Sequence, residues 1–381
     1  MALFRKTSTD TRTNPLETPQ YGWIWKPLVA LVVIYLLVCI VLGIWWSWTP
    51  SPVSPQQAVE RQRGFPQAVD TGAGSATIQP GEALLATNLA MLDTLLNKPG
   101  GYLRNDVMPP GLWLDNMPNW EKGVTRQVQD AVAALGDGLD IGQAPLSHAE
   151  DALGGDLDSW RWPTAEKQLL SARNDLGEAF TALENASRAS SPSQAADTDE
   201  AAVANRDAAS ASGDESSETD GGPDSAADGE SAAATPGQSE APGSPSAENL
   251  SAWLAVAQQR LRTQTRQLAA NVGQSPSGDV QRERTPWFHI DNVFFEARGT
   301  TWALAQLMRA AQIDYAEAIE TAGASTQFDQ LIAELEASQA RLWSPVILNG
   351  SGFGLFANHS LMMANYTVRA TQLIGEIRAQ L

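Results

Sequence analysis

Apolar residues recur at helical spacing along most of the chain. They step by three or four positions in seven segments, at residues 85–96, 124–135, 169–183, 250–272, 291–319, 328–342 and 362–381. Outside one long apolar run, no stretch alternates at period two or is rich in β-branched residues. We expect an all-α domain of about seven helices, with Asn119 and Asn358 as helix N-caps.

The long apolar run, residues 28–46, contains no charge, and thirteen of its residues up to Ile44 are Leu, Ile or Val. At about 1.5 Å per residue it spans about 28 Å, close to the thickness of about 30 Å of a bilayer's hydrocarbon core. Tryptophans flank it on both sides, as at a membrane interface. We expect a single transmembrane helix at 27–48.

A cleaved signal peptide is the alternative interpretation of this run. Its apolar region has about 7–15 residues and ends in small residues, whereas this run is longer and ends in Trp-Trp-Ser-Trp-Thr-Pro. Arg5, Lys6, Arg12 and Lys26 precede the run, so the positive-inside rule predicts a cytoplasmic N-terminal tail, 1–26, and a periplasmic C-terminal domain. The expected location is the inner membrane of a bacterium.

The rest of the chain divides by composition. Residues 49–80 are rich in Pro, Gln and Ser and predict a tether that holds the domain away from the bilayer. The helical domain follows in two parts, 81–189 and 248–381. Between them, residues 190–247 carry twelve acidic residues and one basic residue, Arg206, with one Val and no aromatic residue. Such a segment predicts a disordered acidic loop, either a spacer or a functional element.

Charge and residue types limit the function. The net charge of −19 argues against nucleic-acid binding. One cysteine, Cys39, and three isolated histidines offer no metal-ligand spacing, and no nucleophile, P-loop or zinc-protease motif occurs. We therefore expect no cofactor and no metal, and assign no catalytic residue.

The most unusual segment is residues 98–122, KPGGYLRNDVMPPGLWLDNMPNWEK, which joins two predicted helices. A long loop without periodicity either packs on the core or binds something. The candidate groove has Trp113 and Trp120 as apolar walls, with Asp115 and Asn116 as polar groups. The alternative is that the two tryptophans plug the end of the bundle.

A second glycine-rich stretch, residues 349–354, contains Phe353 and precedes the last helix. It lacks the strand and lysine of a phosphate-binding loop, which favours a tight turn. His359 begins the last helix, where the positive helix end favours a neutral imidazole. We expect this turn and the loop at 98–122 to meet at one end of the bundle and to form the binding site.

Three blocks of sequence resemble a known family: LLNKPGGYLRNDVMPPGLWLDNMPNWE at 95–121, NVFFEARGTTWALAQLM at 292–308 and SPVILNGSGFGLFANHSLMMANY at 344–366. They are similar to domain of unknown function 2333, a set of uncharacterised inner-membrane proteins of Gram-negative bacteria. The resemblance implies one membrane span and a helical exported domain, with no assigned activity. It does not extend over residues 190–247.

Together these features predict a non-enzymatic protein of the cell envelope, bound to the bilayer by one helix and to a protein or cell-wall partner by its domain. The oligomeric state stays open. An enzyme that cleaves cell-wall glycan or peptide is the alternative, with Asp115, Glu121 and His359 at the loop-rich end. A sensor is a third interpretation, which the short cytoplasmic tail weakens.

Overall fold

The computed structural model describes residues 22–64, 78–190, 246–272, 285–342, 347 and 358–381. Over these residues the chain is all-α, with no β-strand. The elements are α1 (Gly22–Trp46), α2 (Pro55–Gln62), α3 (Glu82–Asn97), η1 (Gly111–Trp113), α4 (Asn116–Gly138), α5 (Gln143–Leu153), α6 (Ala165–Ser190), α7 (Ala247–Asn271), η2 (Trp287–His289), α8 (Ile290–Asp314), α9 (Ala316–Thr321), α10 (Ser325–Ala337) and α11 (His359–Gln380).

All seven apolar patterns correspond to helices of the bundle, and the expectation of an all-α fold is confirmed. Asn358 caps α11, with its Oδ1 accepting from the backbone N–H of Leu361 at 2.9 Å. The predicted cap Asn119 is wrong, because α4 already begins at Asn116 and Asp115 precedes it. Helices α2 and α5 were not expected, and the single helix expected at 291–319 is broken at Tyr315 into α8 and α9.

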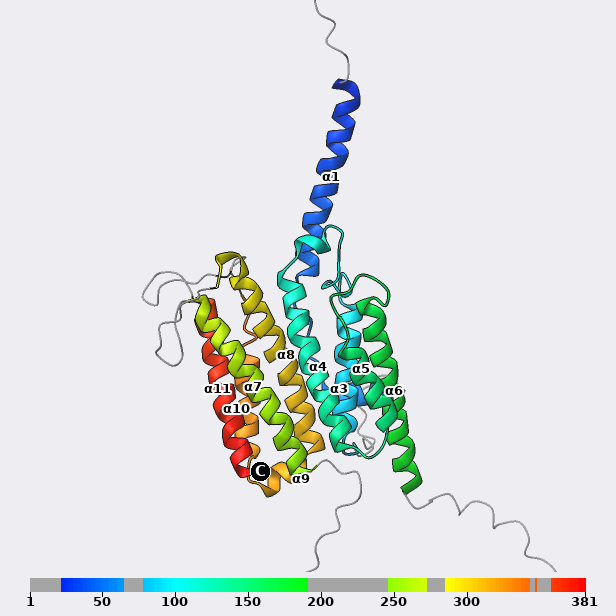
Figure 1. Cartoon of the computed structure of the whole chain (residues 1–381), viewed down its shortest axis with the longest axis vertical. Helices are drawn as coiled ribbons and strands as arrows, with labels where there is room; N and C mark the ends of the chain where they lie inside the picture. The colour runs from blue at the N-terminus through cyan, green and yellow to red at the C-terminus, as the bar shows by residue number, and fades with distance from the viewer. Residues whose placement is uncertain (1–21, 65–77, 191–245, 273–284, 343–346, 348–357) are drawn as a thin grey trace, which may run out of the picture.

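The helices run up and down between two ends of the bundle (Figure 1). Helix α1 rises from one end, which we call the α1 end. The connections α3–α4 and α5–α6, the end of α7 and the start of α8 lie at this end. The C-terminus, α9, the end of α6 and the start of α7 lie at the opposite end. The acidic segment between α6 and α7, residues 191–245, lies outside the described residues.

The two halves of the domain meet where α4 crosses α8. The indole rings of Trp120 and Trp302 pack with centroids 5.0 Å apart, and both residues are almost fully buried. At the crossing the backbones touch, because a Cβ on Gly299 would overlap the carbonyl of Trp120, and one on Gly123 would overlap the backbone of α8. Glycine is required here for close approach.

The segment at 49–80, predicted as an irregular tether, is in part a packed element. Helix α2 buries Ala58 and Val59 in the main core, and the backbone N–H of Val53 donates to Gln306 Oε1 of α8 at 3.1 Å. Arg63, just after α2, forms an ion pair with Glu82 of α3. The chain after α1 is therefore fixed to the bundle at least as far as Arg63, and this part does not act as a free spacer. Residues 65–77 lie outside the described residues.

Candidate functional site

The C-terminal two turns of α1 pack on the bundle. A Cβ on Gly100 would lie 2.7 Å from Cδ2 of Trp46, which means that this indole sits directly over the glycine. Gly43 also faces Leu114, since a Cβ there would meet its Cδ2 at an ordinary contact distance of 3.6 Å. Cys39, one turn earlier, is only 4% exposed. The end of α1 is thus part of the domain's packing.

The loop between α3 and α4 is held by the loop between α5 and α6. Tyr102 donates its hydroxyl proton to the carbonyl of Leu157 at 3.1 Å, and Asn105 donates through Nδ2 to the carbonyl of Ser159 at 3.2 Å. Burial raises the pKa of the Tyr102 hydroxyl, so it remains a donor at neutral pH. These contacts make the two connections one ordered layer at the α1 end.

A buried ion pair fixes the start of the α3–α4 loop. Lys98 Nζ lies 2.6 Å from Glu121 Oε1, and the side chains are 2% and 0% exposed. The backbone N–H of Leu103 also donates to the Glu121 carboxylate, at 3.0 and 3.1 Å. Burial raises the pKa of Glu121 to about 7, against the opposing effect of the Lys98 ammonium and the backbone donors. The pair joins the end of α3, the loop and α4.

A pKa near 7 suits a general acid. A general acid must also reach its substrate, and Glu121 is fully enclosed with its oxygens engaged by Lys98 and Leu103. The arrangement is therefore that of a structural anchor for the loop. Asp115, the other acid considered for catalysis, is exposed.

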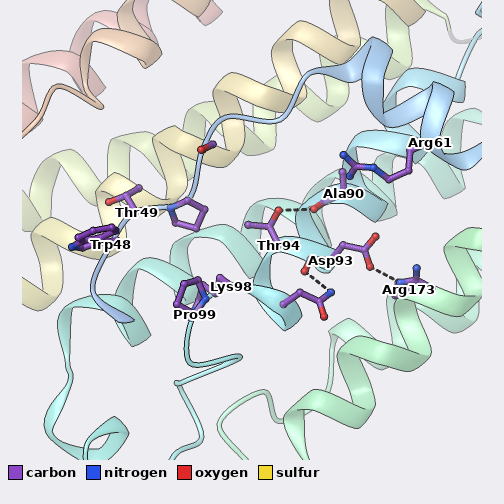
Figure 2. A pocket seen from close by; sticks show the side chains of 12 residues that line it. Trp48, Thr49, Arg61, Ala90, Asp93, Thr94, Lys98, Pro99 and Arg173 are labelled. Carbon is purple, nitrogen blue, oxygen red and sulfur yellow. Dashed lines mark hydrogen bonds and ion pairs between the residues drawn. The ribbon is translucent and has the colours of Figure 1, made fainter. Parts of the chain in front are cut away.

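An open cleft of about 690 Å³ lies beside this anchor, between the segment that follows α1 and helices α2, α3 and α6 (Figure 2). Trp48 stands at one end and Arg61 and Arg173 at the other. Arg173 Nε pairs with Asp93 Oδ1 at 2.6 Å. Asn97 donates through Nδ2 to the carbonyl of Asp93 at 2.9 Å. The cleft thus combines an aromatic wall and the amide of Asn97 with two guanidinium groups and one carboxylate.

Of the residues predicted for a binding groove, Trp113 and Asn116 line one cavity of about 670 Å³ beside the end of α1. Trp113 is 56% exposed in η1, Asp115 is exposed, and Asn116 is partly buried at the start of α4. Trp120 is 1% exposed and belongs to the core of α4 and α8, which means that it is not a wall of any open groove. For Trp120, the alternative of a packed tryptophan is the one that fits.

His359 lies at the start of α11, where its ring packs near Phe294 of α8 with centroids 6.2 Å apart. Burial lowers its pKa, the direction expected for a neutral imidazole, although the expected cause was the helix end. Phe353 and its glycine-rich turn lie outside the described residues. The expected meeting of this turn with the α3–α4 loop therefore stays a prediction.

Sequence reasoning missed the residues of the cleft. Arg61, Asp93 and Arg173 come from three helices and share no local motif. Among the residues that the structure describes, no group of three His, Cys, Asp or Glu side chains gathers as a metal site.

These observations define a class of protein: an all-α bundle attached to an N-terminal helix, Trp25–Trp46, that is long and apolar enough to cross a membrane. The family model described as "Uncharacterized protein conserved in bacteria (DUF2333)" matches residues 18–200 and 234–381. The chain belongs to this family. Searches of curated proteins and of solved structures found no match.

Proposed function

We propose that the protein is a membrane-anchored interaction protein of the bacterial cell envelope, with α1 in the inner membrane, a cytoplasmic N-terminus and a periplasmic domain. The observation that carries this proposal is the packing of Trp46 over Gly100 and the burial of Cys39. A signal peptide is cleaved from the mature protein, so packing between it and the mature domain is not expected. Such packing is expected of an anchor helix that stays attached.

The cleft beside Trp48 is the proposed partner site. In a chain of net charge −19, its two guanidinium groups against one carboxylate give a local excess of positive charge. Of the two arginines that line the cleft, Arg173 is the one that pairs with the Asp93 carboxylate. Arginine binds carboxylates through two parallel hydrogen bonds. We therefore propose a partner that presents an acidic group, from an envelope protein or the cell wall.

Two measurements test the anchor. Alkaline phosphatase fused after Leu381 should be active, and an N-terminal tag should remain on the membrane-bound chain. Loss of the tag from a folded, exported domain would identify α1 as a cleaved signal. An inactive fusion in a fully inserted protein would reverse the topology.

The cleft is tested with a photocrosslinking residue at Asn97, which lines it, and a control at the exposed Gln259 of α7. Crosslinks to a cell-wall fragment or an envelope protein should form from position 97 only. Arg61→Glu should abolish them without loss of folding, because Arg61 is exposed. Equal crosslinking from both positions, or no effect of Arg61→Glu, would contradict the assignment.

A further inference from the structure

Large apolar side chains are exposed on the connections at the α1 end. Seven of them, on three connections, are more than half exposed: Met108, Leu112, Trp113, Trp160, Trp162, Trp287 and Phe288. They come from the α3–α4 and α5–α6 connections and from η2, directly before α8, and Figure 1 places these two connections and the start of α8 at the end from which α1 rises. We call these seven residues the apolar end face.

Hydrogen bonds join two of the three connections. The α3–α4 and α5–α6 loops are joined through Tyr102 and Asn105, as described above. The start of α8, directly after η2, lies at the same end of the bundle (Figure 1). Burial and then the nearby carboxylate of Asp115 raise the pKa of Asp291, which lies two residues after η2.

The length of α1 determines how close the apolar end face lies to the hydrocarbon core of the bilayer. The 22 residues Trp25–Trp46 span about 33 Å, just enough for a hydrocarbon core of about 30 Å. The last part of this helix, from Cys39 to Ile44, lines a cavity of about 670 Å³ together with Pro110, Trp113 and Leu114. If the α3–α4 loop stood clear of the bilayer, only the segment up to residue 38, about 21 Å, would remain to cross it. A helix of that length is too short to cross the hydrocarbon core.

We infer that the apolar end face is a second membrane contact, inserted into the lipid surface of the bilayer that α1 spans. This inference rests on the proposed role of α1 as an anchor. The surface chemistry fits a lipid interface, because tryptophan favours that depth and long basic side chains lie beside it. Arg161 lies over the ring of Trp160, 5.3 Å from its centroid, and Lys167 lies 5.7 Å from that of Trp162.

The charge distribution agrees with this orientation. The acidic segment carries −11 of the net charge, and the described helix ends that flank it, the end of α6 and the start of α7, lie at the end of the bundle opposite α1 (Figure 1). Anionic lipid headgroups repel such a segment. With the end face on the bilayer, the segment begins and ends on the side away from the membrane.

Nitroxide labels in the full chain test the inference. In a Cys39→Ser background, single cysteines replace Met108 and Trp162 on the face, Val256 as a control, and Val33 within α1. Val256 is also an exposed apolar residue, 46% exposed, but it lies on α7. The protein is placed in vesicles of phosphatidylethanolamine and phosphatidylglycerol. Collision of each label with oxygen, which concentrates in lipid, is compared with collision with a water-soluble nickel chelate.

The expected ratio of oxygen to nickel collisions is several-fold higher at 108 and 162 than at 256, and highest at 33. Water-like values at 108 and 162 with a lipid-like value at 33 would overturn the end-face contact and keep the anchor. A water-like value at 33 would overturn the anchor as well. Protection of 108 and 162 from both reagents would mean that protein covers the face, which also overturns the inference.

Discussion

Removal of one partner of the Lys98–Glu121 pair should destabilise the domain strongly. The two side chains are 2% and 0% exposed, so the remaining charge would be left in a site without water. Breaking a buried pair in this way costs about 3–5 kcal/mol. We therefore expect Lys98→Met or Glu121→Gln to lower the free energy of unfolding by about this amount.

The double variant Lys98→Met/Glu121→Gln should lie within about 2 kcal/mol of wild type, because replacement of both charges removes the unpaired group. The glutamine keeps an oxygen for the backbone N–H of Leu103, which the carboxylate accepts in wild type. The two single losses are then far from additive, as expected for residues in direct contact.

Urea unfolding of the full chain in detergent measures these values. At pH 8 the Glu121 carboxyl is mostly ionised, since its pKa is about 7. Near-ultraviolet circular dichroism follows the buried pair of Trp120 and Trp302. The matched control is Arg188→Ala, which removes an ion pair with Glu184 whose arginine is 69% exposed. It should cost at most about 0.5 kcal/mol.

Additive losses in the double variant would refute the reasoning, because they would mean that the two charges do not depend on each other. Single losses as small as that of the Arg188→Ala control would refute it too. A local measurement separates anchoring of the loop from general stability. Hydrogen exchange at the Leu103 amide should accelerate more in Glu121→Gln than amides in α11 do, because this amide donates directly to the carboxylate.

Three further predictions concern other parts of the bundle. Burial raises the pKa of Asp314 to about 7 from an ordinary 3.8, so the folded state holds this proton more tightly. The stability of wild type relative to Asp314→Asn should therefore fall by up to about 1.4 kcal/mol per pH unit from about pH 4 to 7, and parallel urea curves would contradict this. Gly299→Ala should lower the free energy of unfolding in urea by about 1–3 kcal/mol. The control Gly177→Ala, whose Cβ would meet nothing within 4 Å, should leave it unchanged or raise it by up to about 1 kcal/mol. Equal effects of the two substitutions would mean that the α4–α8 crossing is not tight. Replacing residues 191–245 by a short Gly/Ser linker should leave the melting temperature almost unchanged, and a large loss would mean that the segment packs on the domain.

The sequence predicts the long helices because each presents a sustained apolar stripe to the core. Helices α2 and α5 were missed for a physical reason. They have 8 and 11 residues and bury only a few side chains each, such as Ala58 and Val59 or Leu146 and Leu153. Such short elements are stabilised by tertiary packing, which a local pattern does not contain.

The two tryptophans of the α3–α4 segment illustrate the same limit at the candidate site. Trp120 precedes Val124 and Val128 at intervals of four, and this spacing is the signal that places it on the buried stripe of α4. Trp113 has no such companions and is exposed. Composition identified the unusual loop, whereas periodicity distinguishes the buried Trp120 from the exposed Trp113.

Contacts between distant segments were beyond the sequence. Lys98 and Glu121 are 23 positions apart, and the cleft joins α2, α3 and α6. In a chain with 44 acidic residues, no local feature marks Glu121 as one of the few that are buried. Only the packing of α4 against the loop decides which carboxylate loses its water.

The position of the cleft limits which partners can use it. Its wall from Trp48 to Ser51 follows α1 directly, and this wall continues into α2, which is fixed to α3 through Arg63 and Glu82. With α1 as an anchor, the cleft opens only a few residues from the bilayer surface. A soluble partner then has to approach the membrane to enter it, whereas a partner tethered to the same bilayer meets it at high effective concentration. Crosslinks from Asn97 should therefore recover membrane-attached molecules more efficiently than the same molecules released from the membrane. Equal recovery of both forms would place the cleft away from the bilayer.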